Sequence, residues 1–315
     1  MGTPDFAVES LRCLVDGGYN IVGVVTMPDK PIGRHGSVLQ ASAVKQYAVE
    51  HDIKVLQPEK LKDPSFVDEL RGLHADLQIV VAFRMLPEVV WSMPPLGTFN
   101  LHASLLPQYR GAAPINWAII NGEKETGITT FFLRHEIDTG AVIRQRRIPI
   151  GPDDDAGTIH DRLMMLGGQM VIETVEGIKA GTIHPVEQDD IPSSTELRPA
   201  PKIFRDTCHI AWQGLTTQSA HNFVRGLSPY PAAWTTLCAG SQQHDIKIYK
   251  ASPADTDGAS PLPPGSIVTD GKTYLNVRTT DGFLSLQEVQ IAGKRRMPIE
   301  DFLRGFKCKN GMKMS

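Results

Sequence analysis

An amide and an imidazole stand two residues apart, at Asn100 and His102, in a segment rich in polar groups that spans residues 98–111. Side chains of a strand alternate between its two faces, so residues at this spacing point to the same side. An amide that donates and an imidazole that titrates can together stabilise an oxyanion and move a proton. The alternative is a polar strand end that binds nothing, since a lone histidine has many structural roles.

The elements that must position this pair alternate in type over residues 1–150. Short apolar runs are followed by amphipathic helical patterns, which indicates a parallel α/β sheet. We expect strands at residues 21–25, 54–56, 77–82, 126–133 and 141–150. We expect helices after Pro4, at 42–51, 63–71 and 113–120, and from Asp153 to about Gly181. The loop at 27–37 is dense in Pro, Gly and positive charge and is predicted to be mobile.

Composition shifts near residue 187, where a stretch rich in Pro, Ser and polar residues is typical of a linker. After it, residues 212–227 predict one helix. Four short β patterns then follow at 234–237, 245–249, 274–278 and 284–289, which together favour a small barrel. We therefore predict a first domain at 1–187, a linker at 188–202 and a second domain at 203–315.

Bulk composition is that of an ordinary soluble globular protein, with 41% hydrophobic and 21% charged residues among 315. No apolar run is long enough to span a bilayer, and no signal-peptide pattern opens the chain. The four cysteines are scattered without a Cys-x-x-Cys pair, which argues against a disulfide framework or a zinc site and favours the cytoplasm. The net charge of −3 does not by itself indicate a polyanionic partner such as a nucleic acid. Basic residues do cluster at 144–147, at 294–296 and in the tail.

Several motifs together resemble the methionyl-tRNA formyltransferase family over essentially the whole chain. They are Gly-Thr-Pro-Asp-Phe-Ala-Val at residues 2–8, Pro-Asp-Lys-Pro-Ile-Gly-Arg at 28–34, Asn-Leu-His-Ala-Ser-Leu-Leu-Pro at 100–107, Tyr-Arg-Gly-Ala-Ala-Pro at 109–114, Asp-Thr-Gly at 138–140, Gly-Lys-Arg-Arg-Met at 293–297 and Phe-Leu-Arg-Gly at 302–305. The resemblance implies an α/β fold: an N-terminal Rossmann-like, mostly parallel sheet with a C-terminal OB-like β-barrel.

The family implies transfer of a formyl group from 10-formyltetrahydrofolate to the α-amino group of methionine on initiator tRNA. On this view Asn100 donates to the tetrahedral oxyanion, and His102 donates as well when it is protonated. Asp138 holds His102 and accepts the amine proton through water. Taken alone, the sequence Asp-Thr-Gly is also typical of a turn without a catalytic role. No metal is required.

The family also implies two binding regions. Folate contacts are expected after the strand at 77–82 and after the Asn-x-His pair, at Arg84, Met85, Leu86, Ser104, Leu105, Leu106 and Pro107. The roles of Tyr109 and Arg110 stay open. Initiator tRNA contacts are expected at Arg34, Lys30, Lys294, Arg295 and Arg296. The loop around Arg34 continues with His-Gly-Ser where many relatives have Gly and lysines, which puts the strength of its tRNA contact in question.

A second departure lies at the start, where relatives carry a short apolar strand before Gly-Thr-Pro. Without it we expect neighbouring strands to lack hydrogen-bond partners. Our hypothesis is that a shortened start was chosen for the gene, which a native protein that starts at this Met would refute. Two alternatives stay open: a folate-dependent transferase or hydrolase acting on a small substrate, and a tRNA-binding module without catalysis. We expect a monomer.

Overall fold

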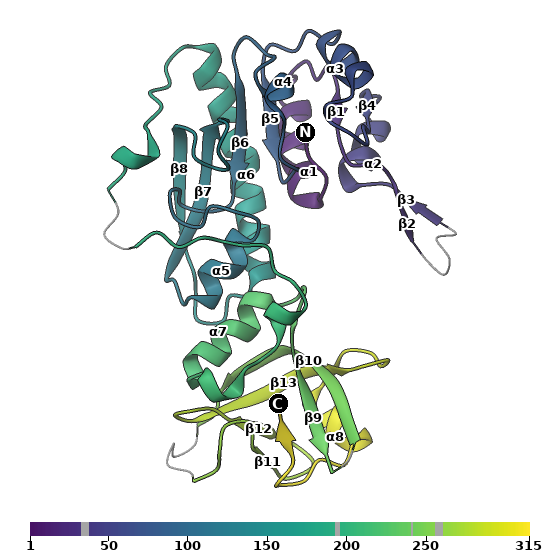
Figure 1. Ribbon diagram of the computed structural model, residues 1–315, viewed down its shortest axis with the longest axis vertical. Coiled ribbons are helices and arrows are strands. Elements are labelled where there is room, and N and C mark those ends of the chain that lie inside the picture. Colours follow the sequence, from purple (N-terminus) through teal and green to yellow (C-terminus); the bar gives the residue numbers. More distant parts are fainter. Residues whose placement is uncertain (33–37, 193–195, 241, 256–260) are drawn as a thin grey trace. The chain divides into compact units, whose positions relative to one another are not determined.

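The computed structural model describes residues 1–32, 38–192, 196–240, 242–255 and 261–315 (Figure 1). The chain divides into two compact units, each built from separate stretches. The first holds Met1–Gly111, Thr126–Ile148 and His160–Pro199, and the second holds Ala112–Glu125, Pro149–Ile159 and Ala200–Ser315. Within the described ranges, no helix is both long and apolar enough to cross a membrane.

The first unit contains a four-stranded sheet in the order β5-β6-β7-β8. Its strands are β5 (Gln78–Val81), β6 (Thr98–His102), β7 (Glu125–Phe132) and β8 (Val142–Pro149). β5 and β6 run parallel, whereas β7 runs antiparallel to β6. A separate parallel pair is formed by β1 (Val24–Val25) and β4 (Val55–Leu56). The expected α/β class is confirmed.

Helices α1 (Asp5–Asp16), α2 (Ala43–Glu50), α3 (Pro64–Arg71), α4 (Glu88–Trp91) and most of α6 (Ala156–Lys179) accompany these strands. The long helix α6 packs on the sheet at Gly167, where an added Cβ would lie 2.8 Å from Leu101 and 2.9 Å from Ile128. The start of α3 follows from its sequence, because the carboxylate of Asp63 accepts the Ser65 N–H and Pro64 occupies the first turn.

The first two residues lie between strands of the first unit. The Gly2 N–H donates to the Val25 carbonyl, and the Val81 N–H donates to the Met1 carbonyl. The Met1 amino group donates to the Ile79 carbonyl at 2.6 Å. At these positions the backbone groups of the neighbouring strands therefore have hydrogen-bond partners, contrary to the expectation. Burial lowers the pKa of the Met1 amino group to about 5.

The second unit is built on an antiparallel sheet in the order β11-β12-β13-β10-β9-β15, with β14 paired to β13. Its strands are β9 (Ala233–Ala239), β10 (Gln242–Pro253), β11 (Ile267–Thr269), β12 (Leu275–Arg278), β13 (Phe283–Ile291), β14 (Met297–Pro298) and β15 (Lys313–Met314). A bridge between Ser266 and Lys313 joins the two ends of this order. The sheet is therefore a nearly closed barrel, as expected.

Helices α5 (Pro114–Ile120), α7 (Thr217–Leu227) and α8 (Ile299–Gly305) belong to this unit. Its apolar core includes Trp212, Leu227 and Leu237, each fully buried. Short 3-10 turns occur at Gln188–Asp190 in the first unit and at Asp206–Cys208 and Trp212–Gly214 in the second.

Two expectations about local structure are wrong in part. Residues 212–227 are not one helix, because α7 begins only at Thr217, where the hydroxyl of Thr216 caps it by accepting the Ser219 N–H. The segment expected to be a loop contains strand β2 (Lys30–Ile32), which pairs antiparallel with β3 (Val38–Gln40).

Candidate active site

Asn100 and His102 lie on β6, whose register sets Asn100 between Val80 of β5 and Phe131 of β7. The amide of Asn100 is partly buried, and its Oδ1 atom is buried without a hydrogen-bond partner among the described residues. A buried acceptor without a donor is costly unless a ligand or water satisfies it. Asn100 therefore has unused hydrogen-bonding capacity at the centre of the sheet.

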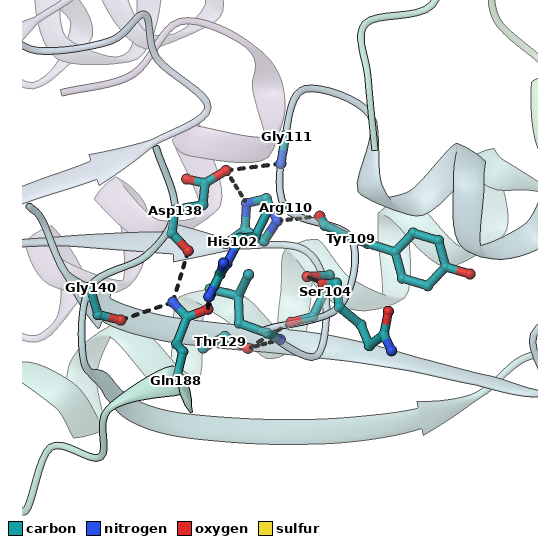
Figure 2. A network of polar contacts seen from close by, with 11 residues as sticks. His102, Ser104, Tyr109, Arg110, Gly111, Thr129, Asp138, Gly140 and Gln188 are labelled. Atoms are coloured by element: carbon teal, nitrogen blue, oxygen red, sulfur yellow. Dashed lines mark hydrogen bonds and ion pairs between the residues drawn. The ribbon is translucent and has the colours of Figure 1, made fainter. Parts of the chain in front are cut away.

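The imidazole of His102, at the end of β6, is 7% exposed and has a neighbour at each nitrogen. Its Nε2 lies 2.9 Å from the Tyr109 carbonyl oxygen, which only accepts hydrogen bonds, so Nε2 carries a proton. Its Nδ1 faces the carboxylate of Asp138 at 3.8 Å (Figure 2). That distance is too long for a hydrogen bond, and the charges attract only when the ring is protonated.

Asp138 comes from the loop after β7, and the structure brings it to His102 as predicted. Its Oδ2 accepts the Gly111 N–H at 3.0 Å, so one oxygen faces both the backbone and the imidazole (Figure 2). Asp138 has a φ of 56°, a left-handed conformation that Asp tolerates better than most residues. The neighbouring Gly140 has no room for a side chain, because an added Cβ would lie 1.6 Å from the Phe132 carbonyl oxygen. The loop is thus closely fitted to the end of β7.

Gln188 fixes this loop from a distant part of the chain. Its buried amide nitrogen donates to the carbonyls of Asp138 and Gly140, at 2.8 and 2.9 Å. Its amide oxygen accepts two hydrogen bonds from the Arg110 guanidinium, at 2.9 and 2.7 Å (Figure 2). Gln188 was expected at the start of the linker and not in the site, and Arg110 had no expected role. Arg110 stands in a motif of the family, but no local pattern marks Gln188 or predicts their contact, because the two residues meet only in the folded chain.

The turn after His102 is braced by neighbouring strands. The Ser104 hydroxyl donates to the Gln108 carbonyl, while the Thr129 hydroxyl donates to the Ser104 carbonyl at 2.6 Å. The amide of Gln145 donates to the Leu106 carbonyl at 2.9 Å. Of the expected folate residues in this turn, Leu105 is partly buried and three are buried: Ser104, Leu106 and Pro107.

The other expected folate segment follows β5. The Arg84 guanidinium donates to the carbonyls of Pro58 and Glu59. The Leu86 side chain belongs to a buried apolar cluster. Met85 is 73% exposed, so among the three expected residues its side chain is the one open to solvent. Any folate contact from Arg84 and Leu86 must therefore use backbone groups unless their side chains move.

The residues expected to contact tRNA differ in their exposure and in their existing contacts. Arg34 lies outside the described residues, and Lys30 is exposed on β2. Lys294 and Arg295 are exposed in the turn between β13 and β14. The Arg296 guanidinium instead makes two hydrogen bonds with the Glu288 carboxylate, at 2.6 and 2.5 Å, which raise its pKa. It also lies 4.3 Å from the centroid of the Tyr249 ring.

Within the part of the chain that the structure describes, no group of three or more His, Cys, Asp or Glu side chains could hold a metal ion.

Comparison with family models gives two matches. A model described as "Formyl transferase" matches residues 1–175, and one described as "Formyl transferase, C-terminal domain" matches residues 202–307. Among curated relatives, the methionyl-tRNA formyltransferase of Parabacteroides distasonis is 64% identical over 98% of this chain and 94% of its own length. That of Bacteroides thetaiotaomicron is 58% identical over 100% of this chain and 97% of its own length.

Solved structures resemble the chain at lower identity. A sugar 3N-formyl transferase, WlaRD, has a TM-score of 0.64 at 19% identity and covers 93% of this chain and 97% of its own. HypX from Aquifex aeolicus in complex with tetrahydrofolic acid has a TM-score of 0.57 at 21% identity, covering 84% of this chain and 47% of its own. At these identities the likeness establishes the fold alone.

Proposed function

This chain belongs to the formyl transferase family, and from that premise we propose that it moves the formyl group of 10-formyltetrahydrofolate to the α-amino group of initiator methionyl-tRNA. The product is formylmethionyl-tRNA for translation initiation. The observation that carries the proposal is the full-length identity to relatives of that name, across both matched regions. We also propose that the protein acts as a monomer in the cytoplasm, which light scattering and cell fractionation can test.

In the proposed reaction the amine lone pair attacks the formyl carbon, and the carbonyl oxygen becomes an oxyanion. Asn100 donates its amide N–H to that oxygen. Its Oδ1, which is buried without a partner among the described residues, accepts an N–H of the attacking amine. The amide thus contacts both the nucleophile and the oxyanion. A donor fixed in this way contributes about 3–4 kcal/mol to the transition state.

His102 and Asp138 handle the amine proton in this proposal. Because Nε2 of His102 is held by the Tyr109 carbonyl, its Nδ1 is the atom that exchanges a proton with the Asp138 carboxylate, and at 3.8 Å that exchange runs through a water molecule. The proton leaves the amine toward this pair through water and returns to N10 of the folate, which departs as tetrahydrofolate. Donation from His102 to the oxyanion, as first expected, requires Nε2 to leave Tyr109 or Nδ1 to be protonated.

Folate is proposed to lie beside Arg84, Met85 and Leu86 and along the turn at residues 104–107. The tRNA is proposed to contact Lys30, Arg34, Lys294, Arg295 and Arg296. Residues 1–187 form the proposed catalytic domain, residues 188–202 the linker, and residues 203–315 the tRNA-binding domain. The support for the first assignment is that every residue of the His102–Asp138–Gln188 network lies in the first unit.

The test is an assay with purified protein, methionine-charged initiator tRNA and 10-formyltetrahydrofolate. Formylation of the charged tRNA that is lost in Asn100→Ala is the expected result. Folate turnover without tRNA would instead identify a hydrolase. Formylation of an amino sugar nucleotide in place of tRNA would identify a small-substrate transferase. Binding of tRNA without turnover would identify an inactive module.

A further inference from the structure

A cavity of about 620 Å³ opens on the barrel of the second unit, and the proposed reaction does not use it. Its walls come from separate segments: Phe204 and Arg205 before the barrel, Tyr230 before β9, Trp234 on β9, Lys247 on β10 and Gly293 after β13. Its size is within the range of ~300–1,000 Å³ that is typical of small-molecule sites. Figure 1 shows the strands β9, β10 and β13 of this barrel.

Two aromatic side chains at this cavity are left open to solvent. Tyr230 is 82% exposed and Phe204 is 62% exposed, whereas Phe283 and Phe302 of the same unit are buried. Rings of this size ordinarily bury most of their surface. Two exposed rings lining one cavity form a surface on which a flat, polarisable group can stack.

The charges beside these rings are mainly positive. The Lys202 ammonium lies 5.5 Å from the centroid of the Phe204 ring, and the Arg205 guanidinium lies 5.1 Å from that of Trp234. Lys247 lines the cavity and is exposed. One carboxylate, that of Asp245, is also in the wall, and it is paired with Arg205 at 2.9 Å. The lining thus holds two cations, Arg205 and Lys247, and one anion, and Lys202 adds a positive charge beside Phe204, which favours a ligand that carries negative charge.

We propose that this cavity holds one unstacked nucleotide of the bound tRNA, with its base on Phe204 and Tyr230 and its phosphate near Lys247. Aromatic faces combined with cations are how proteins hold unpaired nucleotides without reading their sequence. The cavity also reaches the start of the exposed basic turn, because Gly293 lines it and Lys294 and Arg295 follow Gly293 in the sequence. This inference rests on the proposed tRNA substrate.

The test compares tRNA binding by the full-length protein with binding by the double variant Phe204→Ala/Tyr230→Ala. We expect the Kd for initiator tRNA to rise about tenfold or more, since stacking on each base contributes measurably. The dependence of Kd on salt should keep its slope, because no phosphate contact is removed. The kcat at saturating tRNA should stay within about twofold, while KM rises.

Two controls make the test specific. Tyr274 is 38% exposed and does not line the cavity, so Tyr274→Ala should bind tRNA as the parent does. Phe204→Tyr/Tyr230→Phe keeps both rings and should also bind normally. If the double alanine variant misfolds, a second comparison replaces it. Phe204→Tyr/Tyr230→Phe should bind tRNA as tightly as the parent does, whereas Phe204→Leu/Tyr230→Leu should bind tRNA more weakly.

Three results would overturn the inference. In the first, the parent binds and formylates tRNA, and the double variant binds tRNA with the same Kd as the parent. This result leaves the proposed function standing. Another is binding of AMP, used as a probe, that depends on both rings while tRNA binding does not, which would make this a site for free nucleotides. A parent protein that neither binds nor formylates tRNA would remove the proposed function together with this inference.

Discussion

The end of β6 and the barrel of the second unit use polar and aromatic side chains in opposite ways. Around Asp138 the polar groups are largely buried and hold one another, from Gly111 through His102 to Gln188. On the barrel, Tyr230 and Lys294 are exposed and free to meet a partner. Chemistry at one carbonyl needs groups fixed in advance, whereas a large, soft partner is held by many exposed contacts. Changes at the first region should therefore act on kcat, and changes at the second on tRNA affinity.

The largest effect is expected from Asn100→Ala. Loss of one oxyanion donor should lower kcat by about 10²–10³-fold. Stability should change little, because the buried amide oxygen has no partner among the described residues to lose. Steady-state kinetics, folate binding by titration and thermal unfolding measure the three quantities. A large rise in the folate Kd with kcat intact would contradict the assigned role.

Gln188→Leu should lower kcat about tenfold, because the Asp138 and Gly140 carbonyls lose their donor and Arg110 loses its acceptor. Gln188→Glu is the matched control, since it keeps an acceptor for Arg110 but removes the donor to the carbonyls. We expect both variants to be impaired, with the pH profile of kcat displaced. Full activity in Gln188→Glu would show that the contact of residue 188 with Arg110 matters for kcat and that its hydrogen bonds to the two carbonyls do not.

The barrel turn allows a comparison within a single segment. Lys294→Glu/Arg295→Glu should raise the KM for tRNA severalfold and reduce the salt slope by about two, because the variant loses two of the proposed phosphate contacts. Arg296→Ala should do less, because Glu288 already neutralises that guanidinium. Equal effects from both variants would show that Arg296 exchanges Glu288 for phosphate when tRNA binds.

The smallest effect concerns pH. Burial and the nearby Arg225 charge lower the pKa of His221 in α7, and Asp153 opposes them. A folded pKa below the unfolded value means that the folded state binds fewer protons. The stability that His221 contributes is therefore present above its ordinary pKa and is lost as pH falls through its folded pKa. Thermal unfolding between pH 7 and pH 5 should show a shallower slope in His221→Gln, whereas His184→Gln, at an exposed site, should match the parent.

Much of the fold could be predicted because local patterns agree with the final structure. The helix at Pro114–Ile120 begins at a proline and follows its apolar pattern, and the Asp63 cap was readable from residue type alone. The helix expected from residue 212 failed because the Thr216 cap was overlooked and the preceding turn holds Trp212 in the core. Strand β15 is two residues long, and it is defined by its distant partners, β9 on one side and Ser266 on the other, and not by a local pattern.

The three residues proposed for catalysis could be named from the sequence because they sit in distinctive motifs, and the structure brings His102 and Asp138 near each other. Gln188 could not be found this way, since its contacts to Asp138 and Arg110 span 50 and 78 residues of sequence. The pairing of Arg296 with Glu288 was missed for a similar reason: the two residues meet across neighbouring strands, where sequence spacing gives little guidance.

The bridge between Ser266 and Lys313 has a consequence for aggregation. Strand β15 hydrogen-bonds β9 on one side, and its neighbouring backbone meets the residues around Ser266 on the other. Removing residues 312–315 would leave two unpaired edges, one at Leu237 and one at Ile267. Bare strand edges are templates for pairing between molecules. Such a truncated protein should self-associate as its concentration rises, even though the residues proposed for formyl transfer are untouched.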